Sequence, residues 1–125
     1  MKKLLLASTA AALVATGALA GGHAKEVKLG VQFGFTGPIE SLTGPMALGA
    51  EMAMAEVTES GKLLDAAKVM AVRADTGCID NGLATSNAER LISEGINGLI
   101  GGDCSGVTGA ILQNVAIPNG MVMIS

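Results

Sequence analysis

Residues 97–108, Asn-Gly-Leu-Ile-Gly-Gly-Asp-Cys-Ser-Gly-Val-Thr, contain the pattern that decides the fold. The short apolar run 97–101 is typical of a buried strand, and the glycine-rich stretch 102–106 that follows it predicts a loop. Ser105 or Thr108 is suited to begin a helix that reaches about residue 115. A buried strand that passes through such a loop into a helix predicts one unit of a parallel α/β sheet.

The same alternation of strand and helix extends through residues 27–125. The predicted strands are 27–34, 67–74, 97–101 and 121–125. The predicted helices are 46–58 after Pro45, 82–93 with Asp80 or Asn81 as cap, and 105–115. The order βαβαβαβ predicts an α/β fold with a parallel sheet and helices on both faces. Ligands of such folds bind at the carboxyl ends of the strands, here the loops 35–45, 75–81 and 102–108.

The first 20 residues are predicted to form a secretory signal peptide. Lys2 and Lys3 precede an uncharged run rich in Leu and Ala, and Ala18-Leu19-Ala20 offers small residues where a signal peptidase cleaves. The run is about 16 residues, shorter than the roughly 20 that cross a membrane. Cleavage is expected after Ala20, with Gly22-His23-Ala24 as a second site. Neither junction has a cysteine nearby to carry a lipid, so a soluble periplasmic protein is expected.

Composition and charge limit the possible partners. Removal of 20 residues from 125 leaves 105, enough for one small domain. Loss of Lys2 and Lys3 takes the net charge from −3 to −5, and an acidic chain without a basic run is not expected to bind nucleic acid or anionic membranes. The chain is predicted to end in a strand, which ordinarily continues into a connection. The chain is therefore expected to be the first part of a longer protein.

The core is expected to be aliphatic, since Phe33 and Phe35 are the only aromatic residues. Met46, Met52 and Met54 have a spacing that favours a packed helix face over a metal site.

The chain has two cysteines, Cys78 and Cys104. An even number of cysteines in a chain expected to be exported predicts a disulfide. Closing a loop of about 25 residues would restrict the unfolded chain by about 3–4 kcal/mol. Two buried free thiols are the alternative. No metal site is expected, because the chain has no CxxC pair and its one histidine is His23.

No catalytic motif is predicted. Residues 102–106 lack the Gly-x-Ser-x-Gly order of a hydrolase, and no suitable base accompanies Ser105. Residues 44–49 have the glycine spacing of a P-loop without its Lys and Ser/Thr. Asp75 and Asp103 each follow a strand, where isolated carboxylates are more often loop caps or solvated charges than Mg²⁺ ligands or acid–base groups. Neither enzymatic activity nor a cofactor is expected.

Taken together, five stretches resemble the branched-chain amino-acid binding proteins of bacterial ABC transporters, which have the type I periplasmic binding fold. The stretches are Lys28-Leu-Gly-Val31, Thr36-Gly-Pro38, Asp75-Thr-Gly-Cys78, residues 100–108 and residues 117–125. The resemblance implies two lobes that close on an amino acid between them. Residues 1–20 would be the signal peptide and 21–125 an incomplete first lobe. It also implies a Cys78–Cys104 disulfide, an inner-membrane permease as partner and a monomer.

The resemblance implies ligand contacts in the loop after the third strand. They are the Ser105 hydroxyl, the N–H groups of Gly106 and Val107 and the Thr108 hydroxyl, which would hold the α-carboxylate. A helix start directs unpaired N–H groups outward at the positive end of the helix dipole, which suits an anion. A role of Ser105 as helix cap alone is the alternative.

By the same resemblance, Leu42 after the first strand would line the side-chain pocket, where some members carry an aromatic residue. The expected function is binding of an amino acid, branched-chain or related, and its delivery to the permease. The alternative is a periplasmic sensor of the same fold for amides or other small solutes.

Overall fold

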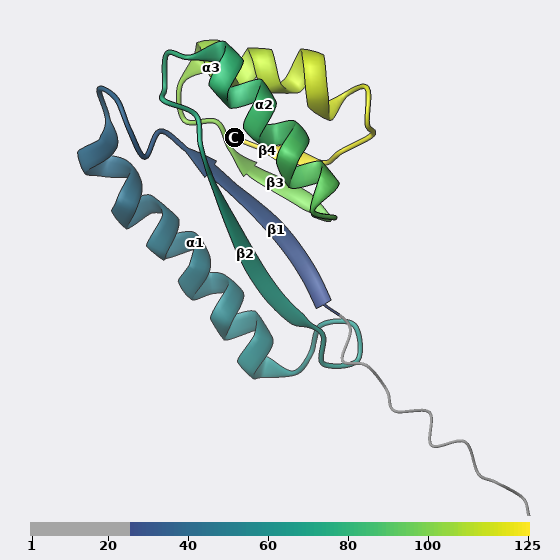
Figure 1. The fold of residues 1–125 in the computed structure, drawn as a ribbon. Coiled ribbons are helices and arrows are strands. Elements are labelled where there is room, and N and C mark those ends of the chain that lie inside the picture. Colours follow the sequence, from purple (N-terminus) through teal and green to yellow (C-terminus); the bar gives the residue numbers. More distant parts are fainter. Residues whose placement is uncertain (1–25) are drawn as a thin grey trace, which may run out of the picture.

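The computed structural model describes residues 26–125, which form a four-stranded parallel sheet with helices on both faces (Figure 1). The predicted α/β class and the alternation of strands and helices are thereby confirmed. The predicted signal peptide, its two cleavage sites and His23 lie outside the described residues.

The strands are β1 (Glu26–Phe33), β2 (Lys68–Asp75), β3 (Gly98–Gly101) and β4 (Met123–Ile124). They lie in the order β2-β1-β3-β4. β1 pairs with β2 along its whole length, and residues 29–32 of β1 pair with β3. β1 is therefore central, and the carboxyl ends of β1, β2 and β3 meet at one edge of the sheet.

The helices are α1 (Glu40–Ser60), α2 (Asn81–Ser93) and α3 (Ser105–Ile111), which continues directly into the π-helical segment η1 (Leu112–Ala116). Figure 1 shows α1 on one side of the sheet and α2 with α3 on the other. Asp80 is the cap of α2, because its Oδ1 accepts a hydrogen bond of 2.9 Å from the Leu83 N–H. Within residues 26–125, no helix combines the length and the apolar character needed to cross a membrane.

The core on the α1 side joins β1 to α1. The buried side chains Val31 and Phe33 of β1 pack against Ala47 and Met54 of α1. Of the three methionines expected on a packed face, Met54 alone is buried, and the prediction is wrong for Met46 and Met52. The sheet contacts a narrower stripe of α1 than the helical spacing suggested.

The core on the opposite face is larger and entirely aliphatic. Its buried members are Ala74, Ala84, Ala88, Leu91, Ile96, Leu99, Val107, Ile111 and Val115. One polar side chain of the central strand, Gln32, is wholly buried beside α2, where its Nε2 donates a hydrogen bond of 2.7 Å to the Ala84 carbonyl. This bond ties β1 to α2.

The first helix begins earlier than predicted. It starts at Glu40, and Pro45 lies inside it, where the missing N–H removes the hydrogen bond to Ser41. The first turn is anchored by a contact with the end of β1. The hydroxyl of buried Thr43 donates a hydrogen bond of 2.9 Å to the Gly34 carbonyl. This bond holds the start of α1 to the end of β1, and helical periodicity does not reveal it.

Gly101 is the last residue of β3 and is paired with Gln32 of β1. Its φ angle is +132°, and a Cβ atom there would lie 1.9 Å from the Gln32 carbonyl oxygen. A side chain at this position would clash with the backbone of the central strand, so the position requires glycine.

Candidate ligand site at the carboxyl edge of the sheet

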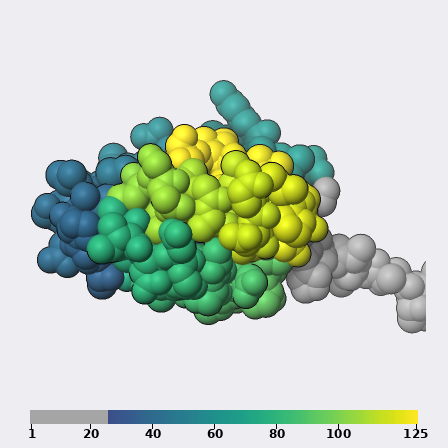
Figure 2. Space-filling view, turned by 90° about the horizontal axis from the view of Figure 1, so that it is seen from above, coloured from purple at the N-terminus to yellow at the C-terminus, as the bar shows by residue number. Residues whose placement is uncertain are grey.

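Three connections meet at the carboxyl edge of the sheet: residues 34–39 after β1, 76–80 after β2 and 102–104 after β3. Figure 2, which views the molecule from above, shows the blue, green and yellow-green segments that contain them next to one another. Hydrogen bonds and a disulfide link all three.

Asp103 binds to the other two connections. Its Oδ2 accepts a hydrogen bond of 2.6 Å from the Gly34 N–H, and its Oδ1 accepts one of 3.1 Å from the Thr76 hydroxyl. The Thr76 hydroxyl in turn accepts a hydrogen bond of 3.1 Å from the Cys78 N–H. The expectation that Asp103 holds loops is therefore confirmed, but its two partners lie far away in the sequence.

Asp75 makes a second set of loop contacts. It accepts hydrogen bonds from the Thr36 hydroxyl at 2.5 Å and from the Gly77 N–H at 2.9 Å. Burial by itself raises the pKa of Asp75. The hydrogen bonds from Thr36, Gly77 and Phe35 outweigh that effect and hold the pKa below its ordinary value. Asp75 therefore acts as an ionised loop cap, the first of the two roles expected from the sequence.

The predicted disulfide between Cys78 and Cys104 is present, with the two Cα atoms 5.3 Å apart. It joins the connection after β2 to the residue that immediately precedes α3. Cys78 is buried and has a φ angle of +61°, which is uncommon for a residue with a side chain. The bond therefore fixes the start of α3 relative to a tightly turned loop.

Ser105 is the first residue of α3, and Cys104 occupies the cap position. The first N–H that bonds within the helix is that of Thr108, to the Cys104 carbonyl at 2.9 Å. The N–H groups of Ser105, Gly106 and Val107 therefore have no carbonyl partner within α3. Ser105 is exposed, and within residues 26–125 its hydroxyl makes no hydrogen bond. Ser105 is thus not the helix cap that the alternative interpretation required.

The other ligand residues predicted in this loop are Gly106, Val107 and Thr108, and they differ in exposure and in hydrogen bonding. The Val107 side chain is wholly buried in the core, whereas Gly106 is exposed. The Thr108 hydroxyl is directed to the backbone, 2.9 Å from the Gly102 carbonyl and 3.0 Å from the Cys104 carbonyl. With its one proton shared between these acceptors, Thr108 stabilises the turn into α3.

Leu42 does not lie in the loop where the sequence analysis expected it. It belongs to the first turn of α1 and is 61% exposed, because the helix begins at Glu40. It remains at the carboxyl edge, since α1 starts there. The reason for the difference is again the anchoring of the first turn through Thr43.

Sequence reasoning missed a hollow of about 350 Å³ at this edge, on the α1 side of the sheet. Phe33, Met46 and Ile124 contribute apolar surface to it, and Asp103 and Ser125 contribute polar groups. None of the five predicted ligand residues lines it. No sequence signal indicated this hollow, because its walls come from four separate segments.

The arrangement offers hydrogen-bond donors and apolar surface. Within residues 26–125, no three His, Cys, Asp or Glu side chains are grouped as metal ligands. The carboxylates of Asp75 and Asp103 are both occupied by loop donors. The free groups are the Ser105 hydroxyl and the N–H groups that follow it, which suit an anion.

Comparisons with known proteins agree with the fold. Residues 26–125 match the profile of a family described as periplasmic binding protein. Leu/Ile/Val-binding protein homolog 7 of Brucella melitensis is 36% identical over 107 residues, which cover 85% of this chain and 25% of that protein. The Brucella suis protein of the same name gives the same values. The chain thus spans about a quarter of the length of these curated relatives.

Two solved structures are also similar. One is the branched-chain amino acid transporter substrate binding protein of Streptococcus pneumoniae in complex with isoleucine, with a TM-score of 0.72 and 25% identity. That match covers 81% of this chain and 28% of the other. The second is an ABC-type branched-chain amino acid transporter from Rhodopseudomonas palustris, with a TM-score of 0.67, 26% identity and coverage of 78% and 26%.

Proposed function

The chain belongs to the periplasmic binding protein family, and from this premise we propose that it supplies the first part of the first lobe of an ABC transporter's substrate-binding protein. The substrate would be an amino acid, branched-chain or related. The names of the similar proteins support this substrate class. In the proposal, residues 1–20 are a signal peptide, residues 21–125 are part of the lobe, and the mature protein is a periplasmic monomer.

The observation that carries the proposal is the start of α3. Ser105 is exposed with a free hydroxyl, and the N–H groups of Ser105, Gly106 and Val107 have no carbonyl partner within the helix. A substrate carboxylate at this point would accept charge-assisted hydrogen bonds, which are about twice as strong as neutral ones. It would also face the positive end of the dipole of α3 and η1.

The surroundings of Ser105 support a preformed site. The disulfide at Cys104 and the hydrogen bonds of Asp103 restrain the backbone immediately before it. Groups held in place before binding lose less conformational entropy when the ligand arrives. In the proposal, the exposed Leu42 contacts the aliphatic side chain of the ligand, and Thr108 assists by fixing the turn.

The proposed activity is binding and release without covalent chemistry. Closure of two lobes would bury the ligand and create the surface that an inner-membrane permease recognises. Both Asp75 and Asp103 already serve as hydrogen-bond acceptors for loops, which leaves them poorly suited to proton transfer.

The test is calorimetric titration of the full-length periplasmic protein, freed of bound ligand by unfolding and refolding. Leu, Ile and Val would be compared with amides and short-chain carboxylic acids. Micromolar or tighter binding of Leu, Ile or Val supports the proposal. Binding of amides or other solutes alone would favour the sensor function instead. Binding of neither group would contradict the proposed substrate class while leaving the family assignment intact.

A further inference from the structure

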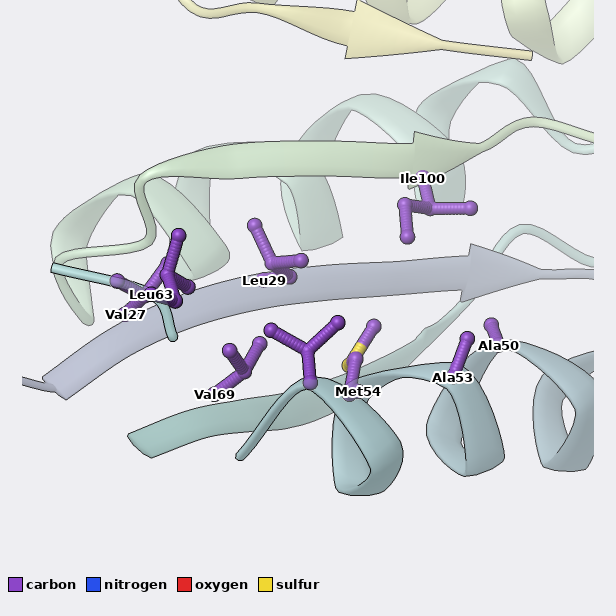
Figure 3. A pocket seen from close by; sticks show the side chains of 9 residues that line it. Val27, Leu29, Ala50, Ala53, Met54, Leu63, Val69 and Ile100 are labelled. Carbon is purple, nitrogen blue, oxygen red and sulfur yellow. The ribbon is translucent and has the colours of Figure 1, made fainter. Parts of the chain in front are cut away.

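Three asparagines of the described chain are each followed by a glycine: Asn81, Asn97 and Asn119. All three lie in or next to connections, whereas the groove between α1 and the sheet is lined by apolar side chains only (Figure 3). Asparagine is thermally labile, because the backbone nitrogen of the next residue can attack its side-chain amide. Glycine in the next position leaves that nitrogen unhindered. The three pairs are therefore candidate sites of spontaneous covalent change.

Two of the three pairs are held by hydrogen bonds. The Asn97 side chain accepts a hydrogen bond of 2.9 Å from the Lys28 N–H of the central strand. The Asn119 side chain donates one of 2.8 Å to the Val115 carbonyl, and the Gly120 N–H after it donates at 3.1 Å to the carbonyl three residues earlier. These bonds have to break before the glycine nitrogen can reach the amide carbon, so both pairs should react slowly.

The pair Asn81 and Gly82 has no such restraint. Both residues are exposed at the start of α2. The cap residue Asp80 accepts hydrogen bonds from the Leu83 and Ala84 N–H groups and not from that of Gly82. Within residues 26–125, neither the Asn81 side chain nor the Gly82 N–H makes a hydrogen bond. The attacking nitrogen and its target are therefore both free.

Ring closure also requires the first turn of α2 to open, and little opposes that opening. The attack turns the peptide group between Asn81 and Gly82 out of its helical orientation. Besides the helix bonds, the groups released are the carbonyls of these two residues, which accept from the Thr85 hydroxyl at 2.9 and 3.1 Å. Helix ends fray at low cost, and a glycine in the first turn lowers that cost further. The pair can thus reach the reactive conformation without unfolding the core.

Asn81 lies beside the start of α3. Its Oδ1 is 3.8 Å from the point where a Cβ atom on Gly106 would lie, and α2 and α3 pack against each other (Figure 1). The Asn81 side chain is a neutral amide. A carboxylate in its place would put a negative charge next to the N–H groups of Ser105 and Gly106, to which the proposed function assigns the substrate carboxylate. The two negative charges would repel each other.

We propose that Asn81 is a self-modification site whose conversion to aspartate weakens substrate binding. The Gly82 nitrogen bonds to Asn81 Cγ, the bond from Cγ to Nδ2 breaks, and the Gly82 proton passes through water to the departing ammonia. Water then opens the five-membered succinimide ring and leaves aspartate or isoaspartate, with one new negative charge. Water is the only other reactant, and nothing is oxidised or reduced. The effect on binding rests on the proposed function, whereas the modification itself does not.

Mass spectrometry tests the modification. The full-length protein is held in mildly alkaline buffer and digested, and each Asn-Gly peptide is followed for conversion to the acid. Asn81 should convert at least about fivefold faster than Asn97 and Asn119, because its amide and the N–H after it are unbonded in a turn that opens easily. Gly82→Ala should slow the reaction and still fold, since a Cβ there lies 3.4 Å from Asp80 Oδ1, an ordinary contact. Conversion at Asn97 or Asn119 as fast as at Asn81 would overturn the proposal, and so would an unchanged rate in Gly82→Ala.

Calorimetric titration of the full-length protein with Leu, Ile and Val tests the effect on binding. Asn81→Asp should weaken binding by roughly three- to tenfold, as expected for a like charge near the surface. Added salt should reduce that loss by screening. The control Gln113→Glu adds the same charge at an exposed position of η1, about 12 Å along the helix from Ser105, and should leave binding unchanged. Asn81→Asp should not lose stability, because a negative charge at a helix N-terminus is favourable.

The outcomes separate this proposal from the proposed function. Wild-type affinity in Asn81→Asp, or an equal loss in Gln113→Glu, would overturn the effect on binding. If the wild type binds none of Leu, Ile and Val, the proposed function fails, while the modification of Asn81 is still decided by mass spectrometry.

Discussion

Asp103 Oδ2 accepts a hydrogen bond of 2.6 Å from the N–H of Gly34, a residue 69 positions earlier in the chain. The bond joins the end of β1 to the connection that leads into α3. Because the same carboxylate also accepts from Thr76, one side chain holds three loops of the candidate site together.

Replacement of Asp103 by Ala should lower the free energy of unfolding by about 2–3 kcal/mol, since hydrogen bonds to charged groups contribute about 1.5–3 kcal/mol. Asp103→Asn should cost less, because its amide oxygen still accepts one of the two donors. Urea unfolding of the full-length protein measures both. A loss below about 0.5 kcal/mol for Asp103→Ala would show that these bonds do not contribute net stability.

Ser105→Ala in the full-length protein should weaken ligand binding by about 1–3 kcal/mol, with little change in stability. The control is Ser86→Ala, which removes the hydroxyl of an exposed serine on α2. Calorimetric titration with the ligand identified by the titrations described above measures both variants. Equal affinities for Ser105→Ala and the wild type would remove Ser105 from the site.

Gly101→Ala should prevent stable folding or cost about 3 kcal/mol or more, because its Cβ would overlap the Gln32 carbonyl oxygen at 1.9 Å. Gly109→Ala is the matched control: the position is helical, and a Cβ there meets nothing within 4 Å. That control should be neutral or stabilising by up to about 1 kcal/mol. Thermal unfolding and soluble yield distinguish the two, and a stable Gly101→Ala protein would contradict the close strand approach.

The disulfide should matter for both stability and binding. The paired variant Cys78→Ser with Cys104→Ser should unfold at lower temperature, with a loss of about 3–4 kcal/mol expected for a loop of this length. Binding should weaken as well, because Cys104 directly precedes Ser105. Reducing agent should reproduce the effect in the wild type and change nothing in the paired variant. An effect of reductant on the paired variant would point to another cause.

Stability should fall in acid partly through Asp75. The pKa of Asp75 is lower in the folded chain than in the unfolded one, so its contribution is complete above about pH 5 and is lost as pH falls through the folded value. The gap in stability between wild type and Asp75→Asn should therefore narrow below about pH 4. Hydrogen bonds from Arg73 also lower the pKa of Glu51, so Asp75→Asn should retain some acid sensitivity. A gap independent of pH would contradict an ionised Asp75.

Local patterns predicted most of the architecture. Strand and helix periodicity predicted the element order, Asp80 or Asn81 as a cap, and a helix start at Ser105 or Thr108, of which the structure has Ser105. The even number of cysteines and the predicted signal peptide together predicted the disulfide, which is present. These succeed because each depends on residues close in sequence, or on a property of the whole chain.

The features that the sequence did not predict depend on contacts between residues that are distant in the sequence. The early start of α1 depends on Thr43 bonding to Gly34. The sequence predicts that Asp103 holds a loop but not which loops, because its two partners lie 27 and 69 positions away. The hollow near Asp103 has walls from separate segments. Met46 and Met52 are exposed because the sheet covers only part of α1. Such features arise from packing between distant segments, which periodicity does not encode.

The central position of β1 has a consequence for the order of assembly. During synthesis, the strand that occupies the middle of the sheet is made before either of its neighbours. β1, α1 and β2 can associate first as a right-handed unit, with β1 pairing along its full length. The free edge of β1 then serves as the template on which β3 is registered, and β3 does the same for β4. The sheet thus grows outward from the strand that is synthesised first. A wrong pairing register at β1 would therefore misplace every strand added after it.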